Sequence, residues 1–208
     1  MKYLLIIGAG GHGKVVVDVA ESLGDYDDIF FIDARFPGLE RHYGRRVIGD
    51  DHFIDDWVRP NVNFIVAVGD NNIRSRIFSN LSVKCASFAT LVAPSATIAS
   101  GCTIGAGTVV FPKATIGPDT IIGSNVILNT ACKLDGDIKI DDHAHIAPGS
   151  KLGVGVMVGS HALVGAGAVM SEGSSLGANS TLGAGAFLDF NLASGKTAVG
   201  RPAVQLNR

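Results

Sequence analysis

A bulky apolar side chain returns at every sixth position through the second half of this chain. The series starts at Val92 and continues without a break through Ile98, Ile104, Val110, Ile116, Ile122, Leu128, Leu134, Ile140, Ile146, Leu152, Val158, Val164, Met170, Leu176, Leu182 and Leu188. A period of six fits neither the 3.6-residue repeat of an amphipathic helix nor the alternation of a simple strand. It is typical of a parallel β-helix built from hexapeptide rungs. We therefore predict that residues 91–208 form an all-β domain, a parallel β-helix followed by a C-terminal tail.

The unbroken period also predicts how the coils stack. Three hexapeptides make one triangular coil of 18 residues, so residues 18 apart should lie one above the other, separated by about 4.8 Å. His143 and His161 have this spacing. Two histidines with no carboxylate in their column do not complete a metal site, so we expect corner or interface residues there and predict no metal.

Residues 1–90 lack the period and predict a small α/β domain of the Rossmann-like kind. The expected elements are strands over Tyr3–Ile7, Ile29–Ile32, Val62–Val68 and Val83–Ser87 and helices over Lys14–Leu23 and Ile73–Leu81. The glycine-rich turn Gly8–Lys14 joins the first strand to the first helix. Strand, glycine turn, helix and strand together make a βαβ unit of a parallel sheet.

Composition excludes several classes of partner. The formal net charge of −2 gives no sign of a surface for nucleic acid or for an anionic membrane. The three cysteines, Cys85, Cys102 and Cys132, lack the spacing of a disulfide framework. The apolar stretch Tyr3–Ile7 is too short for a signal peptide or a membrane span, and we expect a cytoplasmic protein.

The glycine-rich turn predicts a phosphate site. Glycines let the backbone approach a ligand closely, and the start of the following helix offers unpaired N–H groups. The spacing is not that of the dinucleotide fingerprint, so a structural tight turn is the alternative. The candidate residues that bind the substrate here are Gly8, Gly10, Gly11, His12, Gly13 and Lys14. Of these, His12 and Lys14 have ordinary turn and surface roles as alternatives.

Further candidates follow the next two strands. Asp33 ends the second strand, where parallel sheets place ligands, and could accept hydrogen bonds from a base or a ribose. A turn or capping role is the alternative. Asn71 and Arg74 follow the third strand, and Asn71 is as plausible a helix cap as a ligand contact.

The chain as a whole resembles one family. The matching segments are Ile7–Lys14, Asn129-Thr130, Asp135–Asp137, His145–Gly149 and Val199–Ala203. With the hexapeptide repeat they resemble the nucleotide-aminosugar acetyltransferases, which are grouped with the sialic acid O-acetyltransferase family. The resemblance covers nearly the whole chain. It implies a left-handed β-helix and a homotrimer that binds acetyl-CoA between subunits. It also implies that the N-terminal domain binds a nucleotide-linked amino sugar, commonly on UDP.

The same resemblance assigns residues of the β-helix. His145 matches a histidine near the thioester of acetyl-CoA, where it could steady the carbonyl oxygen; an exposed surface histidine is the alternative. Asn129 falls on the substrate side. Ala166 and Ala184 match backbone that lines the pantetheine groove. Lys196 and Arg201 could meet the phosphates of CoA, or could be simply solvated.

One position departs from the family pattern. The family's proposed general base is a histidine between two aspartates, and here Gly136 stands between Asp135 and Asp137. Asp137 or His145 could serve as the base, or the amine could lose its proton to water or to a substrate phosphate. Alternatively the chain is a weakly active or inactive relative that still binds nucleotide sugars, or the glycine is an engineered substitution.

The departure bears on the type of reaction. An amine tolerates the lack of a base better than a hydroxyl, because a fraction of it is already unprotonated. We therefore predict an acetyl-CoA-dependent N-acetyltransferase for a UDP-linked 4-amino sugar in surface-glycan biosynthesis. Sugar O-acetylation is the alternative activity.

Overall fold

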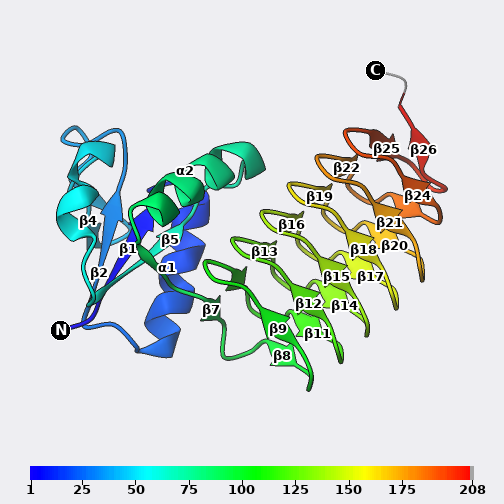
Figure 1. Cartoon of the computed structure of the whole chain (residues 1–208), viewed down its shortest axis with the longest axis horizontal. Helices are drawn as coiled ribbons and strands as arrows, with labels where there is room; N and C mark the ends of the chain where they lie inside the picture. The colour runs from blue at the N-terminus through cyan, green and yellow to red at the C-terminus, as the bar shows by residue number, and fades with distance from the viewer. Residues whose placement is uncertain (207–208) are drawn as a thin grey trace. The chain divides into compact units, whose positions relative to one another are not determined.

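The computed structural model describes residues 1–206 and divides into two compact units, Met1–Pro94 and Ser95–Arg208 (Figure 1). The sequence had suggested a boundary between residues 90 and 91. The last two residues of the predicted second domain, 207 and 208, lie outside the described residues. The fold class is confirmed, an α/β region with a parallel sheet followed by a β-helix.

The first unit is built on a parallel four-stranded sheet of order β2-β1-β5-β6. Its strands are β1 (Tyr3–Ile7), β2 (Asp28–Ile32), β5 (Val62–Val66) and β6 (Ser87–Phe88). The helices are α1 (Gly11–Leu23) and α2 (Asn71–Val83), with short 3₁₀ turns η1 (Asp51–Phe53) and η2 (Asp55–Trp57). A two-stranded hairpin, β3 (Arg41–His42) and β4 (Arg45–Arg46), and the strand β7 (Leu91–Val92) complete the unit.

Both ends of α2 differ from the prediction. The helix begins at Asn71 because Oδ1 of Asp70 accepts hydrogen bonds from the N–H groups of Asn72 and Ile73 (3.0 and 2.9 Å). It runs through Val83, so the strand predicted over Val83–Ser87 is wrong. Cys85 then takes a left-handed conformation (φ 58°), which turns the chain so that only Ser87–Phe88 joins the sheet.

The sheet is buried on both faces. One face packs Leu5, Ile7, Ile32, Ile54, Val62, Phe64, Val66 and Leu81 into a single core beneath α2 and the 3₁₀ turns. Leu4 and Ile6 of β1, both fully buried, point to the other face because successive strand residues alternate. A strand buried on both sides explains the continuous apolar run Tyr3–Ile7.

The second unit is a parallel β-helix with three faces, each named here for one strand. The β16 face contains β10 (Val109–Val110), β13 (Ile127–Leu128), β16 (His145–Ile146), β19 (Leu163–Val164), β22 (Thr181–Leu182) and β25 (Thr197–Val199). The β14 face contains β8 (Thr97–Ile98), β11 (Thr115–Ile116), β14 (Lys133–Leu134), β17 (Lys151–Leu152), β20 (Val169–Met170) and β23 (Phe187–Leu188). The β15 face contains β9 (Thr103–Ile104), β12 (Ile121–Ile122), β15 (Lys139–Ile140), β18 (Met157–Val158), β21 (Ser175–Leu176) and β24 (Asn191–Leu192).

The predicted register is confirmed. Residues 18 apart are direct partners, as in Ile127 with His145 and His145 with Leu163. The repeat position points inward: Ile146 and Val164 are fully buried. From Val110 to Leu188 each rung therefore contributes one buried apolar side chain to a continuous interior stack, whereas Ile98 in the first coil is 37 % exposed.

Sharp corners separate the three faces. From Ile98 to Leu182, the third residue after each repeat position has a left-handed backbone; these residues are Gly101, Gly107, Lys113, Asp119, Asn125, Ala131, Asp137, His143, Gly149, Gly155, His161, Gly167, Gly173, Asn179 and Gly185. Glycine, asparagine and aspartate adopt this conformation at the lowest cost. The corners thus explain part of the glycine content of the chain.

The coil continues where the sequence rhythm fades after Leu188. Leu192 pairs with Leu176 at a spacing of 16 residues (192 − 176), so this coil is shorter but remains in register. The last strand, β26 (Val204–Gln205), pairs antiparallel with β25 and ends that sheet. Within residues 1–206, no helix has the length and apolar character needed to cross a membrane.

Candidate functional site

The glycine-rich turn Gly8–Lys14 links β1 to α1 and overlaps the helix, which begins at Gly11 rather than at the predicted Lys14. It contains one very close packing contact. A side chain on Gly13 would overlap the carbonyl oxygen of Gly8 and would approach Phe31 Cε1 to 3.0 Å. Gly8 has a φ of 109°, and a Cβ there would lie 2.9 Å from the carbonyl oxygen of Ala67. Glycine is therefore required at both positions to bring the helix against the strand.

The other two glycines of the turn face open space. Nothing lies within 4 Å of a Cβ built on Gly10 or Gly11. Gly10 precedes the helix with an extended backbone, and no side chain caps this helix end. The first N–H groups of α1 are thus accessible, as a phosphate site at a helix N-terminus requires.

Asp33 and Arg35 hold this turn in place. Asp33 Oδ2 accepts a hydrogen bond from the N–H of Ala9 (2.7 Å). Arg35 Nε donates to Asp33 Oδ1 (2.7 Å), and Arg35 Nη2 donates to the carbonyl oxygen of Ala9 (2.7 Å). The hydrogen bond from the Arg35 side chain, aided by those from backbone N–H groups, lowers the pKa of Asp33 to about 2.

His12 and Arg74 are held inside the unit. Arg74 is 1 % exposed, and its guanidinium donates to the carbonyl oxygen of Val68 (3.1 Å) and to Asn71 Oδ1 (2.8 Å). Burial lowers the pKa of Arg74 to about 10. Burial and the charge of Arg74 lower the pKa of His12 to about 4, so His12 is neutral at pH 7.

The other residues around the turn differ in their contacts. Lys14 is exposed on the first turn of α1 and is directed to solvent. Asn71 is not the helix cap, which is Asp70; its side chain binds Arg74 instead. His42 donates from Nε2 to the carbonyl oxygen of Gly10 (3.1 Å) and packs edge-on against Phe31.

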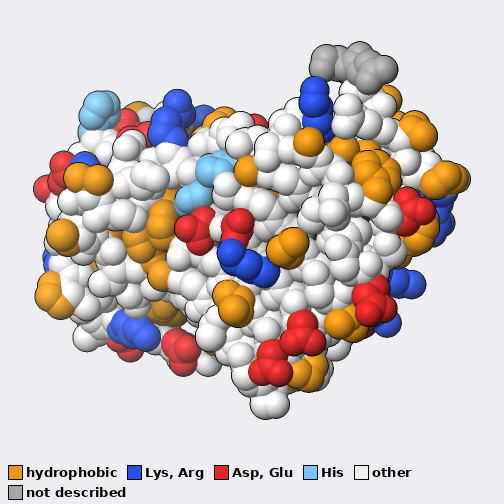
Figure 2. Space-filling view, turned by 45° about the vertical axis from the view of Figure 1, so that its right-hand side comes forward, with side chains coloured by type: hydrophobic (Ala, Val, Ile, Leu, Met, Phe, Trp, Pro, Cys, Tyr) orange, Lys and Arg blue, Asp and Glu red, His pale blue; other side chains and the backbone are white. Residues whose placement is uncertain are grey.

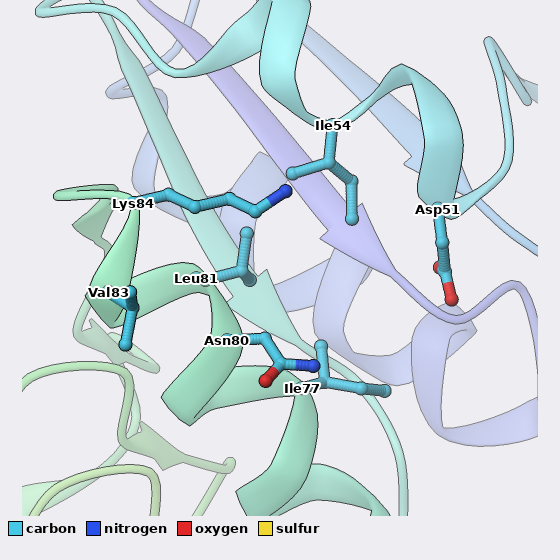
Figure 3. A pocket seen from close by; sticks show the side chains of 7 residues that line it. All are labelled: Asp51, Ile54, Ile77, Asn80, Leu81, Val83 and Lys84. Atoms are coloured by element: carbon cyan, nitrogen blue, oxygen red, sulfur yellow. The ribbon is translucent and has the colours of Figure 1, made fainter.

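A hollow of this unit lies between α2 and η1 (Figure 3). It has a volume of about 310 Å³ and is lined by Asp51, Ile54, Ile77, Asn80, Leu81, Val83 and Lys84. Figure 3 shows Lys84 extending toward the side of the 3₁₀ turns, where its ammonium forms an ion pair with Asp55. None of the predicted site residues lines this hollow.

In the β-helix, Asn129 and His145 form a pair on the β16 face. Asn129 Oδ1 accepts from the N–H of Thr130 (2.8 Å), which directs Nδ2 toward His145 Nε2 (3.3 Å). The amide can only donate through this nitrogen, so Nε2 of His145 accepts and the imidazole proton sits on Nδ1. His145 is half-buried and points outward from β16, because it directly precedes the inward-facing repeat residue Ile146.

A line of exposed backbone runs along the edge between the β16 and β14 faces. Ala166 and Ala184 lie on this edge, and the N–H of Gly185 donates to the carbonyl oxygen of Ala166 (2.8 Å). The N–H groups of Ala166 and Ala184 donate no hydrogen bond within residues 1–206. Arg201 follows Gly200, whose carbonyl oxygen accepts a hydrogen bond from the N–H of Phe187 in β23 (2.9 Å). Lys196 is exposed near the opposite border of the same face.

Asp135, Gly136 and Asp137 lie elsewhere on the prism. They form the corner between the β14 and β15 faces, where Asp137 has a φ of 58°. This corner is opposite the β16 face, so within one chain Gly136 and His145 point to different sides. A Cβ on Gly136 would meet Pro118 O at 3.4 Å, an ordinary contact, so a side chain fits at this position.

The stacking predicted for His143 and His161 is confirmed. Their rings lie 4.9 Å apart between centroids, and Asn125 Nδ2 contacts His143 Nδ1 at 2.9 Å. Within residues 1–206, no three side chains of the His, Cys, Asp or Glu type are placed to hold a metal ion. On the face shown in Figure 2, acidic and basic side chains are interspersed, in keeping with the small net charge.

Two segments of the chain match known families. Residues 3–81 match the PglD N-terminal domain, and residues 155–189 match the hexapeptide repeat of succinyl-transferase. UDP-N-acetylbacillosamine N-acetyltransferase from Bacillus subtilis (strain 168) is 34 % identical over 110 residues, 51 % of this chain. The match spans about half (50 %) of that relative's length.

Solved structures match over the whole chain. The acetyltransferase domain of PglB from Neisseria gonorrhoeae FA1090 is 35 % identical, with a TM-score of 0.95 over 99 % of this chain and 100 % of that one. The chain belongs to the hexapeptide-repeat nucleotide-aminosugar acetyltransferases. A second structure of the same Neisseria domain contains acetyl coenzyme A (TM-score 0.94, 35 % identity, 99 % of each chain).

A third structure in this family contains CoA together with a nucleotide sugar. It is a variant of perosamine N-acetyltransferase from Caulobacter crescentus in complex with CoA and GDP-perosamine. The Caulobacter protein is 30 % identical to this chain, with a TM-score of 0.95 over 100 % of this chain and 98 % of its own. The nucleotides in the names of the relatives thus differ, UDP in one and GDP in another.

Membership in the acetyltransferase family leaves the individual site residues as predictions. The structure gathers Gly8–Gly13, Asp33 and Arg35 at one edge of the sheet and pairs Asn129 with His145. Sequence reasoning missed Arg35 and His42. An arginine two residues after the acidic end of a strand is a weak signal for the first, and the sequence held no signal for the second.

Proposed function

We propose that this protein transfers the acetyl group of acetyl-CoA to an amino group of a nucleotide-linked amino sugar. The observation that carries the proposal is the match over 99 % of the chain to an acetyltransferase domain whose structure contains acetyl coenzyme A. The complex with CoA and GDP-perosamine supports the same pair of substrates. The name of the Bacillus relative supports UDP as the nucleotide. The proposal includes a 4-amino sugar of surface-glycan biosynthesis as substrate and the cytoplasm as the location.

The glycine-rich turn is the proposed site of the nucleotide diphosphate. Its accessible N–H groups at Gly10 and Gly11 can donate to phosphate oxygens. The partial positive charge at the start of α1 adds to this attraction. The neutral state of His12 suits a hydrogen bond to a sugar or phosphate oxygen without adding charge.

The proposed acetyl-CoA site runs along the edge that carries Ala166 and Ala184. Their N–H groups can donate to the amide carbonyls of pantetheine. Arg201 lies further along the edge, where it can meet the CoA phosphates, and Lys196 can do so from the other border. His145 lies on the β16 face, in the coil before that of Ala166, and would adjoin the thioester of acetyl-CoA.

Self-association completes the proposed site. His145 lies on the β16 face, whereas Gly136 and Asp137 lie at the opposite corner of the same coil. One chain cannot bring them to the same acetyl group, but the corner of one copy can meet the β16 face of another. A homotrimer, which the family resemblance suggests, repeats this contact three times by closed symmetry.

The proposed chemistry needs few protein groups. The amine nitrogen bonds to the thioester carbon, the carbonyl oxygen gains negative charge, and the carbon–sulfur bond then breaks to release CoA thiolate. With its proton on Nδ1, His145 is a hydrogen-bond donor, which fits stabilisation of the oxyanion better than proton removal. Asp135 and Asp137 are both exposed at the corner, and Asp137 is the one proposed to orient the amine or to accept its proton.

Gly136 favours a second candidate function, binding of the same ligands with little or no turnover. A general base typically contributes about 10²–10⁴-fold to a rate, and no side chain stands at this position. The same absence makes sugar O-acetylation the weaker alternative, since a hydroxyl nucleophile depends more strongly on a base.

Thiol release from acetyl-CoA tests the activity. The purified chain is assayed with a panel of UDP- and GDP-linked 4-amino sugars, and we expect release with at least one of them. Measurable sugar-nucleotide binding without any release would favour the second candidate. His145→Ala should reduce turnover or use of CoA, whereas His52→Ala, which changes an exposed histidine of the other unit, should not.

A restored base provides a second test. Gly136 lies outside the left-handed region and its Cβ position makes only ordinary contacts, so Gly136→His should fold. A rate increase of ten-fold or more would indicate that the wild-type chain works without a general base. An unchanged rate in a well-folded variant would indicate that the proton leaves by another route.

A further inference from the structure

The carboxylate of Asp33 has no acceptor capacity left. Its Oδ1 accepts from the N–H and the Nε of Arg35 (3.0 and 2.7 Å), and its Oδ2 accepts from the N–H of Ala9 and from Arg35 Nη2 (2.7 and 3.0 Å). A carboxylate offers about four acceptor sites in all. The side chain is only 12 % exposed. The role expected from the sequence, accepting hydrogen bonds from a base or ribose, therefore conflicts with the observed contacts.

The guanidinium of Arg35, in contrast, has donors to spare. Its Nε–H and the two hydrogens of Nη2 are used by Asp33 and by the carbonyl oxygen of Ala9. A guanidinium carries five N–H donors, so the two on Nη1 are left over. Within residues 1–206 no group accepts from Nη1, and the side chain is 60 % exposed.

Arg35 also lies at the correct place for an anion. Its Nη2 donates to the carbonyl oxygen of Ala9 and the carboxylate of Asp33 accepts from the N–H of Ala9, next to Gly10 and Gly11. The space above these glycines is open. Because the low pKa of Asp33 keeps the pair ionised above about pH 3, Arg35 is fixed at neutral pH. An immobilised guanidinium loses little entropy when it binds a phosphate.

We propose that Arg35 binds the diphosphate of the nucleotide sugar through Nη1, and that Asp33 is a positioning residue that holds Arg35 rather than a contact to the ribose or base. The inference rests on the proposed function, because it takes the glycine-rich turn as the nucleotide site. It adds a charged side chain to a site so far proposed from backbone N–H groups and the neutral His12. It also gives the two residues distinct roles that separate substitutions can resolve.

Nucleotide binding tests the assignment. UDP is titrated by calorimetry and uridine by ligand-observed NMR against the wild-type chain, Arg35→Ala, Arg35→Lys and Asp33→Asn. Loss of a charge-assisted hydrogen bond to phosphate should weaken UDP binding by roughly 10- to 100-fold in Arg35→Ala. Uridine, which has no phosphate, should bind nearly as before. Asp33→Asn should weaken UDP binding by a smaller factor, and Arg35→Lys should restore only part of it.

Arg45→Ala is the matched control. Arg45 is also partly exposed and paired with a carboxylate, Glu21 (2.7 Å), but it belongs to the hairpin strand β4 and does not contact the turn. Its removal should leave both affinities unchanged. Thermal unfolding followed by Trp57 fluorescence verifies that each variant is folded.

The outcomes separate the two proposals. A wild-type chain that binds neither UDP nor GDP would overturn the nucleotide site itself. Wild-type binding together with equal UDP affinity in Arg35→Ala would overturn only the role of Arg35. If Asp33→Asn weakens UDP and uridine by the same factor while Arg35→Ala weakens neither, Asp33 contacts the ribose or base directly.

Discussion

The two units position their candidate residues by different means. In Met1–Pro94, the glycine-rich turn depends on contacts that occur once, such as Gly13 against Gly8 and Arg35 against Asp33. In Ser95–Arg208, the pairing of residues 18 apart places each residue directly over its counterpart in the preceding coil. A single substitution can therefore dismantle the first site, whereas in the second the neighbouring rungs preserve the register. The predictions below test this difference, from the largest expected effect to the smallest.

Gly13→Ala should cause the largest loss. The new Cβ would overlap a backbone oxygen of Gly8, so α1 must shift away from the sheet. We expect a loss of about 3 kcal/mol in the free energy of unfolding, in the range seen for severe overpacking. Urea unfolding followed by the fluorescence of Trp57, the single tryptophan, measures it. Gly11→Ala meets nothing within 4 Å and should change stability by less than about 0.5 kcal/mol; equal losses would refute the steric argument.

His12→Gln should alter the acid sensitivity of the first unit. The pKa of His12 is lowered from 6.5 to about 4, so the unfolded chain binds a proton below pH 6.5 that the folded chain does not. Wild-type stability should fall as pH drops from 6.5 to 4. This fall should be on the order of 2 kcal/mol larger than in the variant. Urea unfolding at pH 7, 5.5 and 4.5 measures both, and parallel curves would contradict the prediction.

A matched pair of corner substitutions should give a smaller effect in the β-helix. Ala131 and Gly149 occupy the same corner one coil apart, with φ of 56° and 69°. A non-glycine residue in this conformation costs about 1 kcal/mol. Ala131→Gly should therefore raise the midpoint of unfolding and Gly149→Ala should lower it, as measured by circular dichroism. Shifts of the same sign would show that the corner conformation does not control stability here.

The cysteines should differ in reactivity without any change in stability. Burial raises the pKa of Cys132 to about 12, so this thiol of the β-helix interior should be inert. Cys85 of the first unit is exposed. A chromogenic disulfide reagent at pH 8 should modify Cys85 rapidly and Cys132 only after unfolding. Rapid modification of Cys132 in the Cys85→Ser variant would indicate that the coils open.

Much of the β-helix could be predicted because its signal is local and repeated. The spacing of six establishes which side chains point inward, and the spacing of 18 establishes that His143 stacks on His161. The same count gives the outward direction of His145 and the position of Gly136. The β6 strand was misplaced because the turn at Cys85 depends on a left-handed residue that has no sequence signature.

The sequence by itself determined the two-part architecture, the register of the coils as far as Leu188 and the location of the glycine-rich turn, since each follows from spacing along the chain. Only the tertiary structure decided that Arg35 binds the carboxylate of Asp33, that His42 binds the carbonyl oxygen of Gly10 and that Arg74 is buried. It also decided that His145 and Gly136 lie on opposite sides of one prism. These contacts join residues through irregular loops or across faces, where no period relates the partners and only the closed fold determines which donor meets which acceptor.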